Sequence, residues 1–248
     1  HSEMLDLTEG GCMNEGIVST ELGLKGMPVE AEDIMVYRDI SLLEKTGGRL
    51  HVAHISSKNS VDLVRQAKTK GLSVTCEVAP HHFTLTDEAV RGYDTNTKMS
   101  PPLRTIKDVE AIKEGLGDGT IDIIATDHAP HDTVDKQVEY QNACFGIVGL
   151  ETALPLSLKL VDEKILSMGD LIRKLTSTPA DIFNLKSGKL SLGSDADILI
   201  FNPNLEYLID VSKFHSKSKN SPFDGWKVKG KVMHTLVQGK TVYSAIKN

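Results

Sequence analysis

The chain has 248 residues, of which 40% are hydrophobic and 25% are charged, a balance typical of globular proteins. The formal net charge is −6, and the basic residues are scattered, unlike the clustered basic patch of a nucleic-acid-binding protein. No segment has the length and apolarity of a membrane span. Three widely spaced cysteines favour reduced thiols over a disulfide framework. We therefore expect a cytoplasmic protein with no nucleic acid and no membrane as partner.

Helices and short apolar strands alternate over the first two thirds of the chain. Apolar residues at helical spacing predict a helix over residues 30–46, which ends at Gly47. Further elements are expected in the order strand 49–55, helix 56–70, strand 72–78, helix 106–116, strand 121–125 and helix 151–160. This alternation predicts a parallel βα architecture.

The pattern changes near Lys186. Short apolar runs separated by glycine turns predict antiparallel strands over residues 198–201, 227–232, 233–237 and 241–243, with a turn at 238–240. We place a domain boundary between Asn184 and Gly188, so that residues 1–185 form one domain and residues 186–248 another.

About three complete βα units can be counted, whereas a closed barrel needs about eight. Part of a barrel has exposed sheet edges and cannot bury its inner face. The sequence also begins at His1 rather than at a methionine. Either the fold is an open sheet, or the chain is the C-terminal portion of a longer polypeptide. We expect the second.

The most informative stretch runs from Ile123 to His131. Its apolar strand ends abruptly on Asp127 and His128, and His131 follows after an alanine and a proline. Barrel enzymes place their chemistry at the carboxyl ends of buried parallel strands. Three ionisable groups at one strand end are costly to bury unless a metal or a substrate lies between them. The stretch therefore predicts a metal-dependent active site.

His54 also ends a predicted strand, and His1 would do so if a strand preceded it. Imidazole and carboxylate groups bind Zn²⁺ well, so His1, His54 and Asp127 are candidate ligands. The alternative for each histidine is a structural residue with satisfied hydrogen bonds, and His1 could be an expression scar. His51 lies three residues before His54 and therefore faces the other side of its strand.

Three more features leave two interpretations open. His81 and His82 could bind a metal, or they could fix the loop after their strand by hydrogen bonds. Arg104 could bind an anionic substrate or pair with a neighbouring acid. Gly146 could bring the backbone close to a ligand, or it could belong to an ordinary turn.

Several motifs occur in one order along the chain: His1–Glu3, Met13–Gly16, His51–Ser57, Glu77–His82, Pro101–Arg104, Asp127–His131 and Phe145–Glu151. With these motifs the chain resembles bacterial dihydroorotases of the long type, in the amidohydrolase superfamily. The resemblance covers essentially all of the sequence, including a tail motif at residues 216–223. It implies an α/β fold, in which residues 1–185 are the C-terminal part of a (β/α)8 TIM-type barrel and residues 186–248 belong to a small β-sandwich.

The resemblance also implies a set of site residues. Two zinc ions are expected in a complete active site, His1 and His54 holding one ion and Asp127 the other, with Asp127 also transferring protons. His131 would bind the substrate carboxylate, and the backbone at Phe145 and Gly146 would bind the ring amide. The His-x-His pair, the bridging acid and the arginine of the family's site are not in this sequence, so the chain lacks the N-terminal half of the site.

The implied activity is the reversible cyclisation of N-carbamoyl-L-aspartate to (S)-dihydroorotate in pyrimidine biosynthesis. Ser100 stands where family members carry an asparagine that hydrogen-bonds the pyrimidine ring. This difference keeps open a related cyclic amidohydrolase, such as an allantoinase, a dihydropyrimidinase or a hydantoinase. A third hypothesis is a metal-free structural homologue that partners aspartate carbamoyltransferase. The expected partners are a small-molecule substrate, a second copy of the chain and aspartate carbamoyltransferase.

Overall fold

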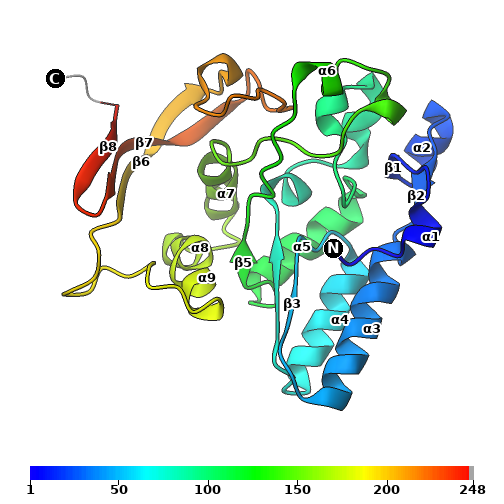
Figure 1. Cartoon of the computed structure of the whole chain (residues 1–248), viewed down its shortest axis with the longest axis horizontal. Coiled ribbons are helices and arrows are strands. Elements are labelled where there is room, and N and C mark those ends of the chain that lie inside the picture. The colour runs from blue at the N-terminus through cyan, green and yellow to red at the C-terminus, as the bar shows by residue number, and fades with distance from the viewer. Residues whose placement is uncertain (246–248) are drawn as a thin grey trace. The chain divides into compact units, whose positions relative to one another are not determined.

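The computed structural model describes residues 1–245 and separates into two compact units (Figure 1). The first unit consists of residues 1–151 and 211–222, and the second of residues 152–210 and the segment from residue 223 onward. The sequence predicts two domains that are each continuous in the chain, residues 1–185 and residues 186–248. The boundary between them stays a prediction. Among the described residues, no helix is long and apolar enough to cross a membrane.

A three-stranded parallel sheet forms the centre of the first unit. Its strands are β3 (Leu50–Val52), β4 (Val74–Val78) and β5 (Ile123–Ile124), adjacent in that order. Leu50 pairs with Val74, and Glu77 pairs with Ile123. The predicted strands lie at these places but are shorter than expected. Because the strands are parallel, their carboxyl ends share one edge of the sheet, where barrel enzymes carry their chemistry.

Helices α3 (Glu30–Thr46), α4 (Lys58–Thr69) and α5 (Ile106–Gly117) alternate with these strands, as predicted. The side chain of Ser57 accepts a hydrogen bond from the Ser60 amide and caps α4, as N-cap serines commonly do. Val61 and Val64 of α4 are fully buried. Burial of each such side chain contributes about 1.5–3 kcal/mol.

Several short elements of the first unit were not predicted. They are α1 (Leu5–Thr8), β1 (Met13–Asn14), α2 (Ile17–Leu22), β2 (Gly26–Met27), η1 (Pro80–Phe83), η2 (Asp87–Gly92), η3 (Thr95–Thr97), α6 (Thr133–Lys136), η4 (Tyr140–Asn142) and η5 (Val211–Lys213). Strands β1 and β2 pair in parallel. Elements of two to six residues show too little periodicity to be read from a sequence.

The second unit contains α7 (Ala153–Asp162), α8 (Met168–Leu175), α9 (Ser177–Ile182) and an antiparallel sheet in the order β6 (Ile198–Leu208), β7 (Lys227–Val237), β8 (Lys240–Ser244). The two strands expected before residue 238 form one continuous strand, β7. The turn before β8 has two residues, Gln238 and Gly239, with φ of 49° and 74°. Positive φ at both positions is the geometry of a tight hairpin.

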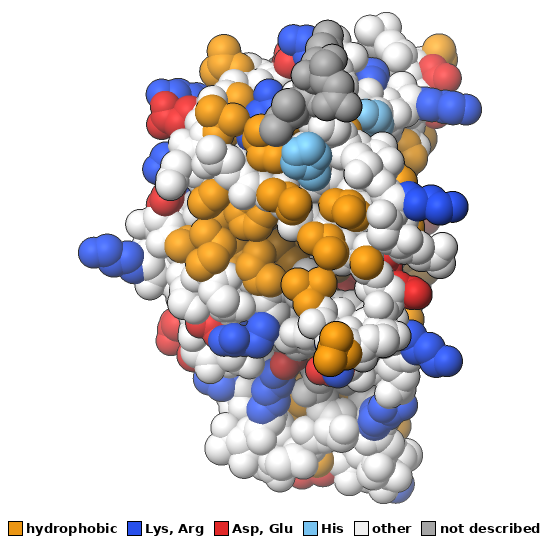
Figure 2. Space-filling model, turned by 90° about the vertical axis from the view of Figure 1, so that its left-hand side faces the viewer, with side chains coloured by type: hydrophobic (Ala, Val, Ile, Leu, Met, Phe, Trp, Pro, Cys, Tyr) orange, Lys and Arg blue, Asp and Glu red, His pale blue; other side chains and the backbone are white. Residues whose placement is uncertain are grey.

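One face of the molecule, on the side of this antiparallel sheet, gathers apolar side chains (Figure 2). Large apolar side chains of the second unit that are exposed include Leu190, Leu192, Leu199, Leu208 and Val242. An apolar surface of this kind is typical of a contact with another protein segment.

Candidate active site

His54 and Asp127 both follow their strands with a positive φ angle. His54 follows β3 with φ of 33°, and Asp127 follows β5 with φ of 47°. Left-handed backbone is uncommon for residues other than glycine, and it persists only where the surroundings enforce it. The two predicted metal ligands therefore share a local strain at one edge of the sheet.

His54 and His1 face each other at that edge. Their ring centroids lie 4.4 Å apart at an interplanar angle of 58°. The Nδ1 atom of His54 is buried and has no hydrogen-bond partner among the described residues. A buried imidazole nitrogen without a partner is costly, and a bound cation would satisfy it. These two side chains therefore fit a zinc ion, whose preferred ligands include imidazole nitrogens.

The carboxyl group of Asp127 interacts with the charges of His54 and Glu77. Burial raises the pKa of its carboxyl group, the charge of His54 opposes this rise, and the charge of Glu77 adds to it. Among the described residues, one group of three potential metal ligands has its ligand atoms within 4.8 Å of one another, and this group lies elsewhere in the chain. The ligand atoms of His1, His54 and Asp127 therefore do not all lie that close together. The geometry thus brings the rings of the two histidines together, and Asp127 interacts with His54 through its charge.

His131, Phe145 and Gly146, which were predicted to bind substrate, meet in one loop region. The Nε2 atom of His131 lies 2.7 Å from the Phe145 carbonyl oxygen. Gly146 has φ of 111°, and a Cβ atom there would lie 2.4 Å from the Cβ of Ala129. Only glycine allows this close approach of two loops. Gly146 is therefore more than an ordinary turn residue.

Asn220 holds this region together and was missed by sequence reasoning. Its Nδ2 atom donates to the carbonyl oxygens of Ala129 and Gly146, at 3.0 and 3.2 Å. Its Oδ1 atom accepts from the His131 amide at 3.3 Å. Asn220 is buried and lies within a tail motif of the family resemblance, residues 216–223. That motif was the available signal, but it did not reveal the contact.

Glu3 is a second residue that the sequence did not single out. One of its carboxylate oxygens lies 3.6 Å from Nδ1 of His1 and 3.4 Å from the hydroxyl of Ser100. Ser100, predicted to bind substrate, therefore donates to a carboxylate that also contacts a candidate metal ligand.

Arg104 and His82 have structural roles. The Arg104 guanidinium lies 3.8 Å from Glu32 and donates to Asn14, and both members of the ion pair are 4% exposed. The pairing interpretation of Arg104 is thus confirmed. His82 donates from Nε2 to the Pro101 carbonyl oxygen at 2.9 Å. Burial lowers the pKa of His82 to about 3, so the ring is neutral and fixes the loop.

Residues 7–242 match the Amidohydrolase family. The chain belongs to the amidohydrolase family. This amidohydrolase is 56% identical over 99% of its length to a dihydroorotase of Geobacter sp. (strain M21), and 55% identical over 98% to one of Syntrophus aciditrophicus (strain SB). The chain spans 58% and 57% of these two curated relatives. Members of the family are generally metal-dependent.

Solved amidohydrolase structures share the fold. An L-hydantoinase (dihydropyrimidinase) from Arthrobacter aurescens superposes with a TM-score of 0.83 at 34% identity, over 88% of this chain and 50% of that one. A dihydropyrimidinase from Brevibacillus agri NCHU1002 gives a TM-score of 0.87 at 24% identity, over 98% and 56%. The predicted fold class, part of a TIM-type barrel with a C-terminal β domain, is confirmed.

Proposed function

We propose that this amidohydrolase is part of a dihydroorotase, which interconverts N-carbamoyl-L-aspartate and (S)-dihydroorotate. The observation that carries the proposal is the 56% identity to a dihydroorotase over 99% of the chain. Its small-molecule substrate would bind at the carboxyl edge of the parallel sheet. Supporting evidence comes from the His1–His54 contact and the strained backbone of Asp127 at this edge.

The candidate metal ligands suit this chemistry. His1 and His54 would hold one zinc ion, and Asp127 would contact a second. When bound, zinc supplies Lewis-acid polarisation of a carbonyl and lowers the pKa of water. Asp127 would accept a proton as water attacks the ring amide, and then donate it to the departing nitrogen.

The loop around His131 would bind the substrate. Because a carbonyl oxygen can only accept, the His131 Nε2 atom donates to Phe145. A protonated ring would then donate from Nδ1 to the substrate carboxylate, a charge-assisted bond. Backbone groups of Phe145 and Gly146 would bind the ring amide. Ser100 would contact the pyrimidine ring, with its hydroxyl already oriented toward Glu3.

A hydantoinase or dihydropyrimidinase is the second candidate. It is favoured by Ser100 in place of the usual asparagine and by the 34% identity to an L-hydantoinase of closely similar fold. A metal-free partner protein is disfavoured by the buried, unpaired Nδ1 of His54. A cytoplasmic location, a homo-oligomer and binding to aspartate carbamoyltransferase stay predictions from the sequence.

The test is a substrate competition with the complete protein loaded with zinc. Dihydroorotate, hydantoin, dihydrouracil and allantoin are offered together, and each product is quantified. We expect ring opening of dihydroorotate to dominate, and N-carbamoyl-L-aspartate to cyclise in the reverse assay. Preferential turnover of hydantoin or dihydrouracil would replace this proposal by the second candidate. Loss of turnover on zinc removal tests the metal requirement.

A further inference from the structure

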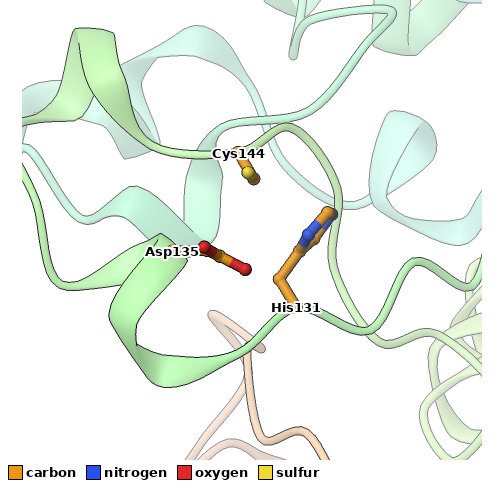
Figure 3. Close-up of side chains that lie close together, drawn as sticks. All are labelled: His131, Asp135 and Cys144. Atoms are coloured by element: carbon orange, nitrogen blue, oxygen red, sulfur yellow. The ribbon is translucent and has the colours of Figure 1, made fainter.

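A further group of metal-binding side chains lies in the loop region after β5 (Figure 3). A ring nitrogen of His131, a carboxylate oxygen of Asp135 and the sulfur of Cys144 all lie within 4.8 Å of one another. No other group of three such side chains does so within the part of the chain that the structure describes. Figure 3 shows the three side chains directed into one space, Asp135 from α6 and Cys144 from the segment after η4.

The donor set suits a thiophilic divalent cation. Imidazole, carboxylate and thiolate are the protein ligands of zinc, with bonds of about 2.0–2.3 Å. Ligand atoms around one tetrahedral ion are therefore about 3.3–3.8 Å apart. Asp135 and Cys144 are exposed, so rotation of their side chains can close the remaining distance. Three protein ligands leave the fourth position open to water.

The surrounding hydrogen bonds preorganise the group. Because His131 donates from Nε2 to the Phe145 carbonyl at 2.7 Å, Nδ1 of the neutral ring is left with the lone pair that a metal requires. Metal-binding histidines usually donate their other ring N–H to such an acceptor. The Cys144 amide donates to the Asp135 carbonyl at 3.2 Å. Lys136 donates to the carbonyl oxygens of Cys144 and Gly146, at 2.7 and 3.0 Å.

We propose that His131, Asp135 and Cys144 form a binding site for a thiophilic divalent cation such as Zn²⁺, separate from the ligands His1, His54 and Asp127. On binding, the Cys144 thiol releases its proton to solvent and its sulfur bonds to the cation. The cation occupies Nδ1 of His131, the atom that the proposed function assigns to the substrate carboxylate. Excess zinc therefore competes with substrate, and this consequence alone rests on the proposed function.

The binding test uses the complete protein, loaded with its resident metal, and needs no activity. Zn²⁺ is titrated with dialysis and metal analysis, and Co²⁺ is titrated as a spectroscopic probe. We expect one additional ion per chain, with a thiolate-to-cobalt charge-transfer band. Cys12 and Cys76 are buried, so the band should disappear in Cys144→Ser. Asp135→Asn should weaken binding at least about tenfold.

Asp132→Asn is the matched control. Asp132 is exposed, precedes α6 and caps it by accepting from the Val134 amide, a role that asparagine also fills. This variant removes one negative charge from the same loop and should bind Co²⁺ like the parent. An additional ion that survives in Cys144→Ser, or no additional ion in the parent, would overturn the site.

Activity provides a separate readout. Zinc inhibition of the parent should be competitive with substrate and relieved in Cys144→Ser, whose turnover without added zinc is unchanged. Binding without inhibition would overturn the competition with substrate and leave the cation site standing. If the complete protein did not turn over dihydroorotate, the amount of Co²⁺ bound in the titration would be unaffected. The two proposals can therefore be overturned independently.

Discussion

The rings of His1 and His54 lie 4.4 Å apart, although 53 positions separate the two residues in the sequence. His1 precedes every strand of the parallel sheet, whereas His54 directly follows β3. The buried Nδ1 atom of His54 has no hydrogen-bond partner among the described residues. A bound cation explains both features, because it satisfies the nitrogen and holds the rings together.

Asp127→Asn in the complete protein should leave the fold intact and remove most activity. The amide keeps the volume of the carboxylate but cannot accept and return a proton. General acid–base transfer contributes roughly a hundredfold to ten-thousandfold to the rate. Steady-state turnover of dihydroorotate measures the loss, with circular dichroism as the check on folding. Near-normal turnover would show that another group carries the proton.

Gly146→Ala should disturb the substrate loop. Gly146 has φ of 111°, and the new Cβ atom would lie 2.4 Å from the Cβ of Ala129. Strain of this kind costs on the order of 1–3 kcal/mol. We expect a raised KM and a lower melting temperature. Gly119→Ala is the control, because it also has positive φ but open space around the new atom. Equal effects on KM in the two variants would mean that the close approach is unimportant.

The sequence predicted long periodic elements well. Helix α3 matches its expected bounds of 30–46, and α4 and α5 agree within two residues. These segments were readable because buried residues such as Val61 and Val64 recur at helical spacing and Ser57 provides a cap. Elements of two to six residues, such as β1 and α6, carry no periodicity and depend on contacts far away in sequence.

Without the family resemblance, the sequence indicates candidate site residues chiefly where they end an apolar strand. His54 and Asp127 were proposed as metal ligands in this way, and those roles stay predictions. Asn220 contacts Ala129 across 91 positions and Gly146 across 74, and an isolated asparagine in a polar tail gives no local signal of such a contact. The side chains of Asp135 and Cys144 meet only because the chain turns back at η4.

Asn220→Ala should weaken the loop that carries His131. The variant leaves the half-buried carbonyl oxygen of Ala129 without its side-chain donor, whereas the carbonyl oxygen of Gly146 keeps its bond from Lys136. A buried polar group left unsatisfied costs about 1–3 kcal/mol. We expect the free energy of unfolding to fall by this amount and KM to rise, with unchanged content of the resident metal. Asn142→Ala, at an exposed position bonded to Glu139, should change neither quantity. Loss of metal from the Asn220→Ala variant would show instead that Asn220 supports the metal ligands.

Acid should destabilise the folded protein through His82. Burial lowers the pKa of His82 from 6.5 to about 3 in the folded state. Between these values the unfolded chain binds a proton that the folded protein excludes, so the free energy of unfolding rises with pH and levels off above about 6.5. The His82 contribution to this slope is at most about 1.4 kcal/mol per pH unit.

The measurement is urea unfolding of the complete protein at several pH values between about 4 and 7. His82→Gln keeps an N–H donor for the Pro101 carbonyl but cannot titrate. Its stability should therefore depend less steeply on pH below 6.5, although burial also lowers the pKa of the neighbouring His81, so part of the slope remains. If the two proteins lose stability in parallel as the pH falls, His82 is not the group that the fold keeps neutral.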